Sequence, residues 1–129
     1  MRSTSLRGAL SAGALALALT AGVAHADGDP AHGKQVFARC SGCHDITGPS
    51  FAAPSLGGVF GRKAATAAGF TYSTALKGSG LVWGDDTLDR FLTAPGALVA
   101  GTTMLITVPD AKDRADVIAY LKTLPASAP

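Results

Sequence analysis

The sequence predicts a small all-α domain, and three observations lead to this. Three segments each begin with an aspartate that can cap a helix and then space apolar residues three and four apart. No segment shows the sustained alternation of apolar and polar residues that marks a half-buried strand. The composition, 47% apolar and 16% charged, is typical of a globular protein, and 129 residues allow one hydrophobic core.

The first predicted helix opens at Asp29, which is placed to cap it, and Pro30 occupies the first helical position. Proline suits that position because the N–H group it lacks would have no partner within the helix. Val36 and Phe37 give the helix its apolar face, and the helix is expected to run into Cys40.

Two further helices are expected in the second half of the chain. Asp85 or Asp86 caps one that Pro95 ends, and Asp110 caps the last one, which Pro125 ends. Each has one apolar face, formed by Leu88, Phe91 and Leu92 in the earlier helix and by Val117, Ile118, Leu121 and Leu124 in the later one. A loop over residues 96–109 is expected to join them.

The section from residue 45 to residue 83 is rich in glycine and mostly irregular, with only residues 72–77 expected to be helical. A compact domain seldom contains so long an irregular stretch unless it is functional or wraps around something. The pattern therefore indicates a large cofactor that forms part of the core.

Residues 1–26 read as a signal peptide, which leaves residues 27–129 as the mature domain. Two arginines precede an apolar run over residues 8–23, and Ala24-His25-Ala26 supplies the small residues of a cleavage site. The run is shorter than the roughly 20 residues that span a membrane. We therefore expect a periplasmic or otherwise exported protein without stable membrane insertion, the alternative being an uncleaved anchor.

The mature chain is close to neutral. Two of the eleven Lys and Arg residues lie in the predicted leader, so nine remain against nine acidic residues. Since there is no basic run either, the sequence gives no indication of a nucleic-acid partner.

The segment Cys40-Ser41-Gly42-Cys43-His44 carries the chemistry. Two thiols at this spacing can add to the two vinyl groups of a haem, and a histidine directly after them can bind the iron. The motif predicts one covalently attached haem c per chain.

Two other kinds of site could use the same cysteines. A tetrahedral zinc site would have to use Cys40, Cys43, His32 and His44, but the adjacency of Cys43 and His44 strains that geometry. A thioredoxin-like redox pair would require strands alternating with helices, which the sequence does not show.

Met104 is the candidate for the sixth iron ligand. It is the only methionine after the leader, it lies in the loop between the last two helices, and a thioether ligand raises the reduction potential of haem. A methionine that merely fills a gap in the core is the alternative, and His32 is the rival ligand.

In its cysteine–histidine motif and in Met104, the chain resembles the class I c-type cytochromes, namely mitochondrial-type cytochrome c and its bacterial relatives. The resemblance spans nearly the whole mature chain and includes residues 54–63 and 69–72. It implies that the N- and C-terminal helices cross, with Gly33 and Phe37 packed against Tyr120, and that the loops wrap around the haem.

The resemblance also implies roles for residues around the haem. The carbonyl of Pro54 would accept the N–H of His44, although Pro49 is a second candidate because the intervening loop is short. Tyr72 and Trp83 would hold a haem propionate, with Arg62 nearby. These three could otherwise be two core aromatics and a surface charge.

Thr102 resembles the threonine beside the methionine ligand. Leu76 and Phe91 stand where the family often has an asparagine and a tyrosine. These replacements predict a drier pocket on the methionine side.

The resemblance implies a one-electron carrier, not an enzyme, with no catalytic residues. We expect a monomer that takes electrons from a quinol-oxidising complex or a dehydrogenase and passes them to a terminal oxidase or a similar acceptor. The alternatives are a haem enzyme or gas sensor, which needs an open sixth position on the iron, and a fixed subunit of a dehydrogenase complex.

Overall fold

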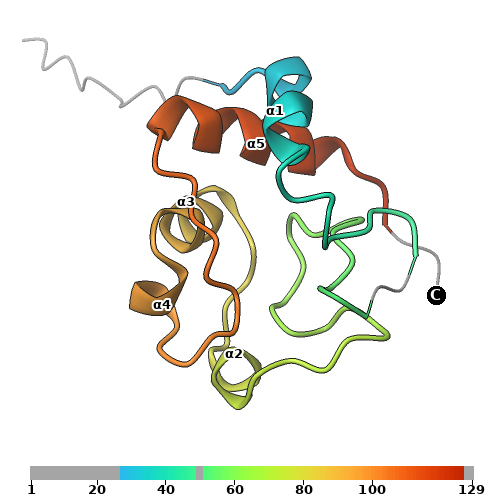
Figure 1. Ribbon diagram of the computed structural model, residues 1–129, viewed down its shortest axis with the longest axis vertical. Coiled ribbons are helices and arrows are strands. Elements are labelled where there is room, and N and C mark those ends of the chain that lie inside the picture. Colours follow the sequence, from blue (N-terminus) through green and yellow to red (C-terminus); the bar gives the residue numbers. More distant parts are fainter. Residues whose placement is uncertain (1–26, 49–50, 127–129) are drawn as a thin grey trace, which may run out of the picture.

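The computed structural model describes residues 27–48 and 51–126, and their regular structure is helical (Figure 1). In chain order the helices are α1 (Pro30–Phe37), α2 (Thr74–Gly78), α3 (Asp85–Thr93), α4 (Pro95–Leu98) and α5 (Ala111–Thr123). Extended pairing in these ranges is limited to one isolated bridge between Lys63 and Val82. The all-α prediction is confirmed, while the predicted leader lies outside the described residues.

The helices α1 and α5 cross closely at Gly33 (Figure 1). A Cβ atom on Gly33 would lie 1.9 Å from the carbonyl oxygen of Asp116, so no larger residue fits without separating the helices. One turn further along, the rings of Phe37 and Tyr120 pack with their centroids 5.3 Å apart. The crossing of the terminal helices is therefore as expected.

The caps of α1 and α5 agree with the sequence. The Asp29 carboxylate accepts the N–H of Ala31 at 2.8 Å, with Pro30 in the first turn. The Asp110 carboxylate accepts the N–H of Asp113 at 2.8 Å. Both carboxylates satisfy backbone donors that a helix start leaves without a helical partner.

The start of α3 and the segment after it differ from the prediction. The N-cap of α3 is Gly84, whose N–H is bound by the hydroxyl of Thr87 at 2.8 Å. Asp85 and Asp86 instead occupy the first turn, where negative charge interacts favourably with the helix dipole. Pro95 does end α3, but it also begins α4, so the prediction of an uninterrupted loop over residues 96–109 is wrong for its first three residues.

The buried apolar side chains come from helices that lie far apart in the sequence. They include Val36 and Phe37 of α1, Leu76 of α2, Leu88, Phe91 and Leu92 of α3, and Val117, Ile118 and Leu121 of α5. No helix among the described residues is long and apolar enough to cross a membrane.

A buried carboxylate strengthens the helix crossing. Asp116 is 2% exposed and accepts hydrogen bonds from the Lys112 ammonium, from the N–H of Asp29 at 2.7 Å and from the His32 ring at 2.7 Å. These donors, with Lys112 the strongest, lower the pKa of Asp116 to about 2 although burial opposes the shift. His32 thus lies at the α1–α5 crossing, half exposed and paired with Asp116.

We predict that Asp116 accounts for part of the acid sensitivity of the fold. Because its pKa is lowered in the folded state, its stabilising effect is complete above about pH 4 and is lost as the pH falls to about 2. In Asp116→Asn, the free energy of unfolding should be lower at neutral pH and should decline less steeply over that interval. Denaturant titrations at several pH values measure this, with Asp113→Asn as the control because Asp113 is more exposed on the same helix. Equal pH slopes for wild type and Asp116→Asn would contradict it.

Candidate haem site

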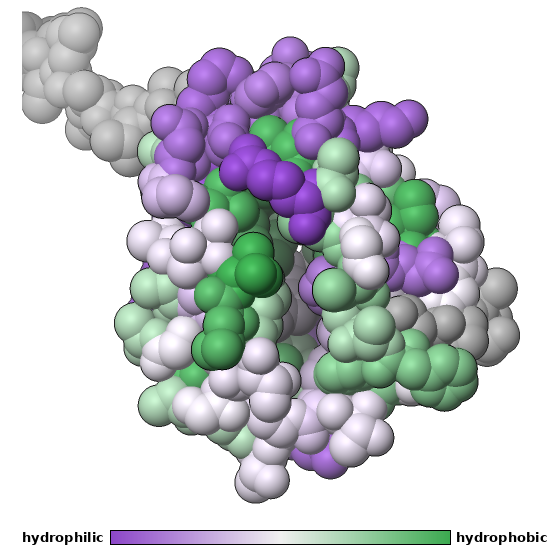
Figure 2. All heavy atoms as spheres, in the orientation of Figure 1, coloured by the Kyte–Doolittle hydropathy of each residue, from purple (hydrophilic) through white to green (hydrophobic). Residues whose placement is uncertain are grey.

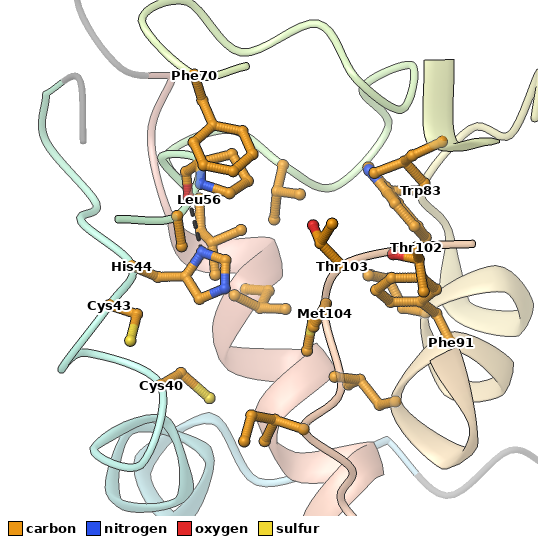
Figure 3. Close-up of a pocket in the computed structure, with 18 of the residues that line it drawn as sticks. Cys40, Cys43, His44, Leu56, Phe70, Trp83, Phe91, Thr102, Thr103 and Met104 are labelled. Carbon is orange, nitrogen blue, oxygen red and sulfur yellow. Dashed lines mark hydrogen bonds between the residues drawn. The ribbon is translucent and has the colours of Figure 1, made fainter. Parts of the chain in front are cut away.

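A cavity of about 410 Å³ opens between the helices and the irregular segments (Figure 3). It is within the size range of cofactor sites, and most of its wall is apolar. Its lining comes from α1 and the motif after it, from residues 52–73, from α2, α3 and α5, from Trp83 between α2 and α3, and from residues 102–108. Segments distant in sequence therefore share one site.

The cysteine–histidine motif enters the cavity directly after α1. Turns continue the helix, since the N–H of Cys40 bonds to the carbonyl of Phe37 at 2.8 Å and the N–H of His44 to the carbonyl of Cys40 at 2.9 Å. Cys40 is half buried, and burial raises the pKa of its thiol. Cys43 is exposed. Figure 3 shows both sulfurs beside the His44 ring on one side of the cavity.

One hydrogen bond fixes the orientation of His44. Its Nδ1 lies 2.7 Å from the carbonyl oxygen of Pro54, as the dashed line in Figure 3 shows. Because a carbonyl can only accept, Nδ1 must carry the proton, and Nε2 keeps its lone pair for a metal. Burial lowers the pKa of His44, which this bond partly opposes, so the ring is held neutral. Pro49, the other candidate, lies outside the described residues.

Met104 reaches the cavity from the other side, on the segment between α4 and α5 (Figure 3). Around it the wall is apolar: Leu76 and Phe91 are both buried there. The Phe91 ring packs against Trp83 with a centroid distance of 4.9 Å. Thr102 also lines the cavity. At positions 76 and 91, the wall facing Met104 thus carries no polar side chain.

Polar groups collect at a third part of the wall. The backbone N–H of Trp83 donates to the carbonyl of Arg62 at 2.9 Å, and the backbone N–H of Gly61 donates to the carbonyl of Trp83 at 2.6 Å. These two bonds place two distant segments side by side. The hydroxyl of Tyr72 accepts the N–H of Ala67 at 3.2 Å and keeps its own proton to donate. Arg62, Tyr72 and Trp83 all line the cavity.

Arg62 has one donor left over. Its two terminal nitrogens donate to the carbonyls of Gly57 and Ser55, each at 2.8 Å, whereas its buried Nε has no partner among the described residues. Burial lowers the pKa of Arg62, and the neighbouring Tyr72 opposes this. A buried, unpaired guanidinium N–H is costly, so an anionic group in the cavity would stabilise it. A haem propionate is such a group.

The described residues to which the sequence assigns a role at the haem thus surround one cavity, whereas His32 lies at the α1–α5 crossing. Two thiols, a neutral imidazole, a thioether and an unpaired cationic donor match the vinyl groups, the iron and the propionates of a haem. Sequence reasoning missed Leu56, Val59 and Phe70 in the apolar lining, because such residues carry no signal beyond hydrophobicity. The fold and the site define a small helical protein that binds haem covalently.

Comparisons with known proteins give the same result. The family model for cytochrome c matches residues 30–125. A cytochrome c2 from Rhodomicrobium vannielii is 48% identical over 105 residues, which are 78% of this chain and 82% of the relative. A cytochrome c from Tetrahymena pyriformis is 49% identical over 100 residues, 76% of this chain and 91% of the relative. The solved structure of cytochrome cH from Methylobacterium extorquens matches with a TM-score of 0.71 and 43% identity, covering 74% of this chain and 99% of that one.

The chain belongs to the cytochrome c family. It binds haem c covalently and is an electron-transfer protein, not an enzyme. The resemblance seen in the sequence is confirmed, and the zinc and thioredoxin-like alternatives are set aside.

We predict that both thiols attach the haem. In Cys40→Ala or Cys43→Ala, one thioether should remain, and the position of the absorption bands of the reduced haem in alkaline pyridine should shift because one vinyl group stays unreacted. The double variant should release its haem into acidified acetone, whereas denatured wild type should retain it. Release of haem from wild type would contradict the prediction.

Proposed function

We propose that this protein is an exported one-electron carrier in which His44 and Met104 are the axial ligands of the haem iron. The observation that carries the proposal is their placement in the same cavity, on opposite sides, with the Pro54 carbonyl fixing the tautomer of His44. When bound, haem supplies an iron that alternates between the ferric and ferrous states by gaining or losing one electron.

The chain's own residues provide the conditions for such a carrier. The hydrogen bond to Pro54 holds the imidazole in one orientation, and Leu76 and Phe91 exclude water from the side of Met104. An environment of this kind changes little when the iron changes its charge, which favours rapid transfer. A gas sensor or haem enzyme would need a sixth position that is open or easily vacated. Ligation by Met104 is therefore the feature that separates the two functions.

Most of the surface around the mouth of the cavity is uncharged, and we propose it as the contact for redox partners. The exposed Arg39 also lines the cavity, but it is paired with Asp113 at 2.6 Å. Residues 51–61 and 91–109, which contribute many of the cavity-lining residues, contain no charged residue. Leu105 and Ile106, next to Met104, are 80% and 61% exposed. Figure 2 shows hydrophilic residues gathered over α1 and α5 and down to the upper edge of the central hollow, with mostly apolar or neutral ones along its sides and below it.

The partners we propose are redox proteins. The donor is a quinol-oxidising complex or a dehydrogenase, and the acceptor is a terminal oxidase or a similar protein. The carrier is a monomer that diffuses between them, in contrast to a fixed subunit of a dehydrogenase complex. Size-exclusion chromatography of the native protein distinguishes these two forms, because only the subunit would elute with the complex.

We further propose that residues 1–26 are a signal peptide and that the mature domain comprises residues 27–129, in the periplasm or an equivalent compartment. Support comes from the packing of Gly28, where a Cβ atom would lie 2.1 Å from the carbonyl oxygen of Ala115 in α5. The domain is thus folded from directly after the proposed cleavage site. N-terminal sequencing of the purified protein should begin at Asp27.

Removal of Met104 tests the axial ligation. Ferric wild type should show the sulfur-to-iron charge-transfer band, and Met104→Ala should lose it, bind carbon monoxide readily when reduced, and have a lower reduction potential. Leu105→Ala is the control, because its side chain is adjacent and exposed and should leave the band unchanged. Absence of the band in wild type would overturn methionine ligation and favour the sensor.

The scarcity of charge around the cavity mouth predicts a weak dependence of electron transfer on salt. Because residues 51–61 and 91–109 carry no charge and Arg39 is paired with Asp113, long-range attraction adds little. The second-order rate constant with the physiological partner should therefore change by less than about threefold as ionic strength rises to about 0.15 M, where the screening length is about 8 Å. Ala100→Lys adds a charge at an exposed position of the same surface and should make the rate clearly salt-dependent. A steep fall for wild type would show that charges from elsewhere in the fold steer the encounter.

A further inference from the structure

The segment that carries Met104 has little structure of its own. At its beginning, the N–H of Thr102 bonds to the carbonyl of Val99 at 3.0 Å, directly after Gly101, whose positive φ of 92° turns the chain. At its end, the N–H of Val108 bonds to the carbonyl of Leu92 in α3 at 2.8 Å. Between these ends, the backbone of residues 103–107 makes no hydrogen bond to the described residues. The position of Met104 therefore depends on the two anchors.

A single side chain of α5 reinforces the second anchor. Arg114 is 12% exposed, and its Nη1 donates to the carbonyl oxygens of Val108 at 2.9 Å and Pro109 at 2.8 Å. Its Nε donates to the carboxylate of Asp89 in α3 at 2.7 Å. One guanidinium thus links α5, α3 and the end of the Met104 segment. The planar, multiply donating guanidinium suits such a junction, whereas an ammonium group cannot reproduce this geometry.

The helix to which Arg114 ties the segment also forms the wall opposite His44. Leu88, Phe91 and Leu92 of α3 line the cavity, and Val108, whose carbonyl Arg114 binds, lines it as well. Val108 is only four residues after Met104, so the fixed end of the segment lies about 14 Å of extended chain or less from the ligand. Fixing that end restricts the space in which the thioether can move, which raises its effective concentration at the iron.

We propose that Arg114 is a positioning residue for the axial methionine: it holds the Met104 segment against α3, so that displacement of Met104 from the iron by an external ligand depends on Arg114. This inference rests on the proposed ligation by Met104. The proposed effect of Arg114 is on the replacement of Met104 by an external ligand, which can be measured separately from the stability of the fold.

The test measures imidazole binding to the ferric holoprotein, in which imidazole must displace Met104. Arg114→Ala should bind imidazole about tenfold more tightly than wild type or more, which corresponds to about 1.4 kcal/mol. The matched control is Lys122→Ala, because Lys122 forms an ion pair from the same helix to Asp85 of α3 at 2.7 Å without touching the Met104 segment. That control should change the affinity by less than about threefold. Asp89→Asn leaves both carbonyl bonds of Arg114 in place, so its affinity for imidazole should be closer to that of wild type than the affinity of Arg114→Ala is.

The result that overturns the proposal is an equal imidazole affinity for Arg114→Ala and Lys122→Ala while wild type shows the sulfur-to-iron band. That result would support ligation by Met104 and would refute the positioning role of Arg114. Absence of the band in wild type would instead overturn the ligation itself. Should Arg114→Ala not yield folded holoprotein, Arg114→Lys decides in its place: an affinity above wild type supports the proposal, and an unchanged affinity refutes it.

Discussion

The contact on which the rest of the structure depends is the crossing of α1 and α5. The backbone of α1 can approach the carbonyl of Asp116 only because residue 33 has no side chain. This approach fixes the direction of α1, and thereby the point at which the cysteine–histidine motif enters the cavity. From α5, Val117 and Leu121 also line the cavity. Since α5 takes part in both the crossing and the haem site, a change that separates the two helices should also distort the site.

The remaining walls come from segments that cannot form a core by themselves. The described residues of the segment 45–73 contain no helix, and those that line the cavity face a space that only a large group can fill. The polarity of that space is ordered: apolar near Leu76 and Phe91, and rich in donors near Arg62, Tyr72 and Trp83. An amphipathic cofactor with anionic groups at one edge satisfies both regions. Because these contacts exist only in the folded protein, the bound cofactor should stabilise the folded state.

The helices could be predicted from the sequence because their signals are local: a capping aspartate, a proline, and apolar residues at helical spacing. The start of α4 was missed because Pro95 can both end one helix and begin the next. Asp116 resembles an ordinary surface charge in the sequence, and its burial arises only from the crossing. In the same way, the sequence leaves Pro54 and Pro49 open as partners of His44, since hydrogen bonding to a backbone carbonyl depends on tertiary structure.

Two arginines each hold a loop of the cavity wall by donating hydrogen bonds to backbone carbonyls. Their spacing in the sequence does not reveal these roles. Arg62 binds the carbonyls of Ser55 and Gly57, directly after the proline that orients His44, and Arg114 binds the carbonyls at the end of the Met104 segment. Both use backbone acceptors, which every residue provides. Residues 54–57 and 102–109 can therefore be held in place although none of them is charged. Most of the surface around the cavity mouth can thus be uncharged while the segments that orient His44 and carry Met104 remain fixed.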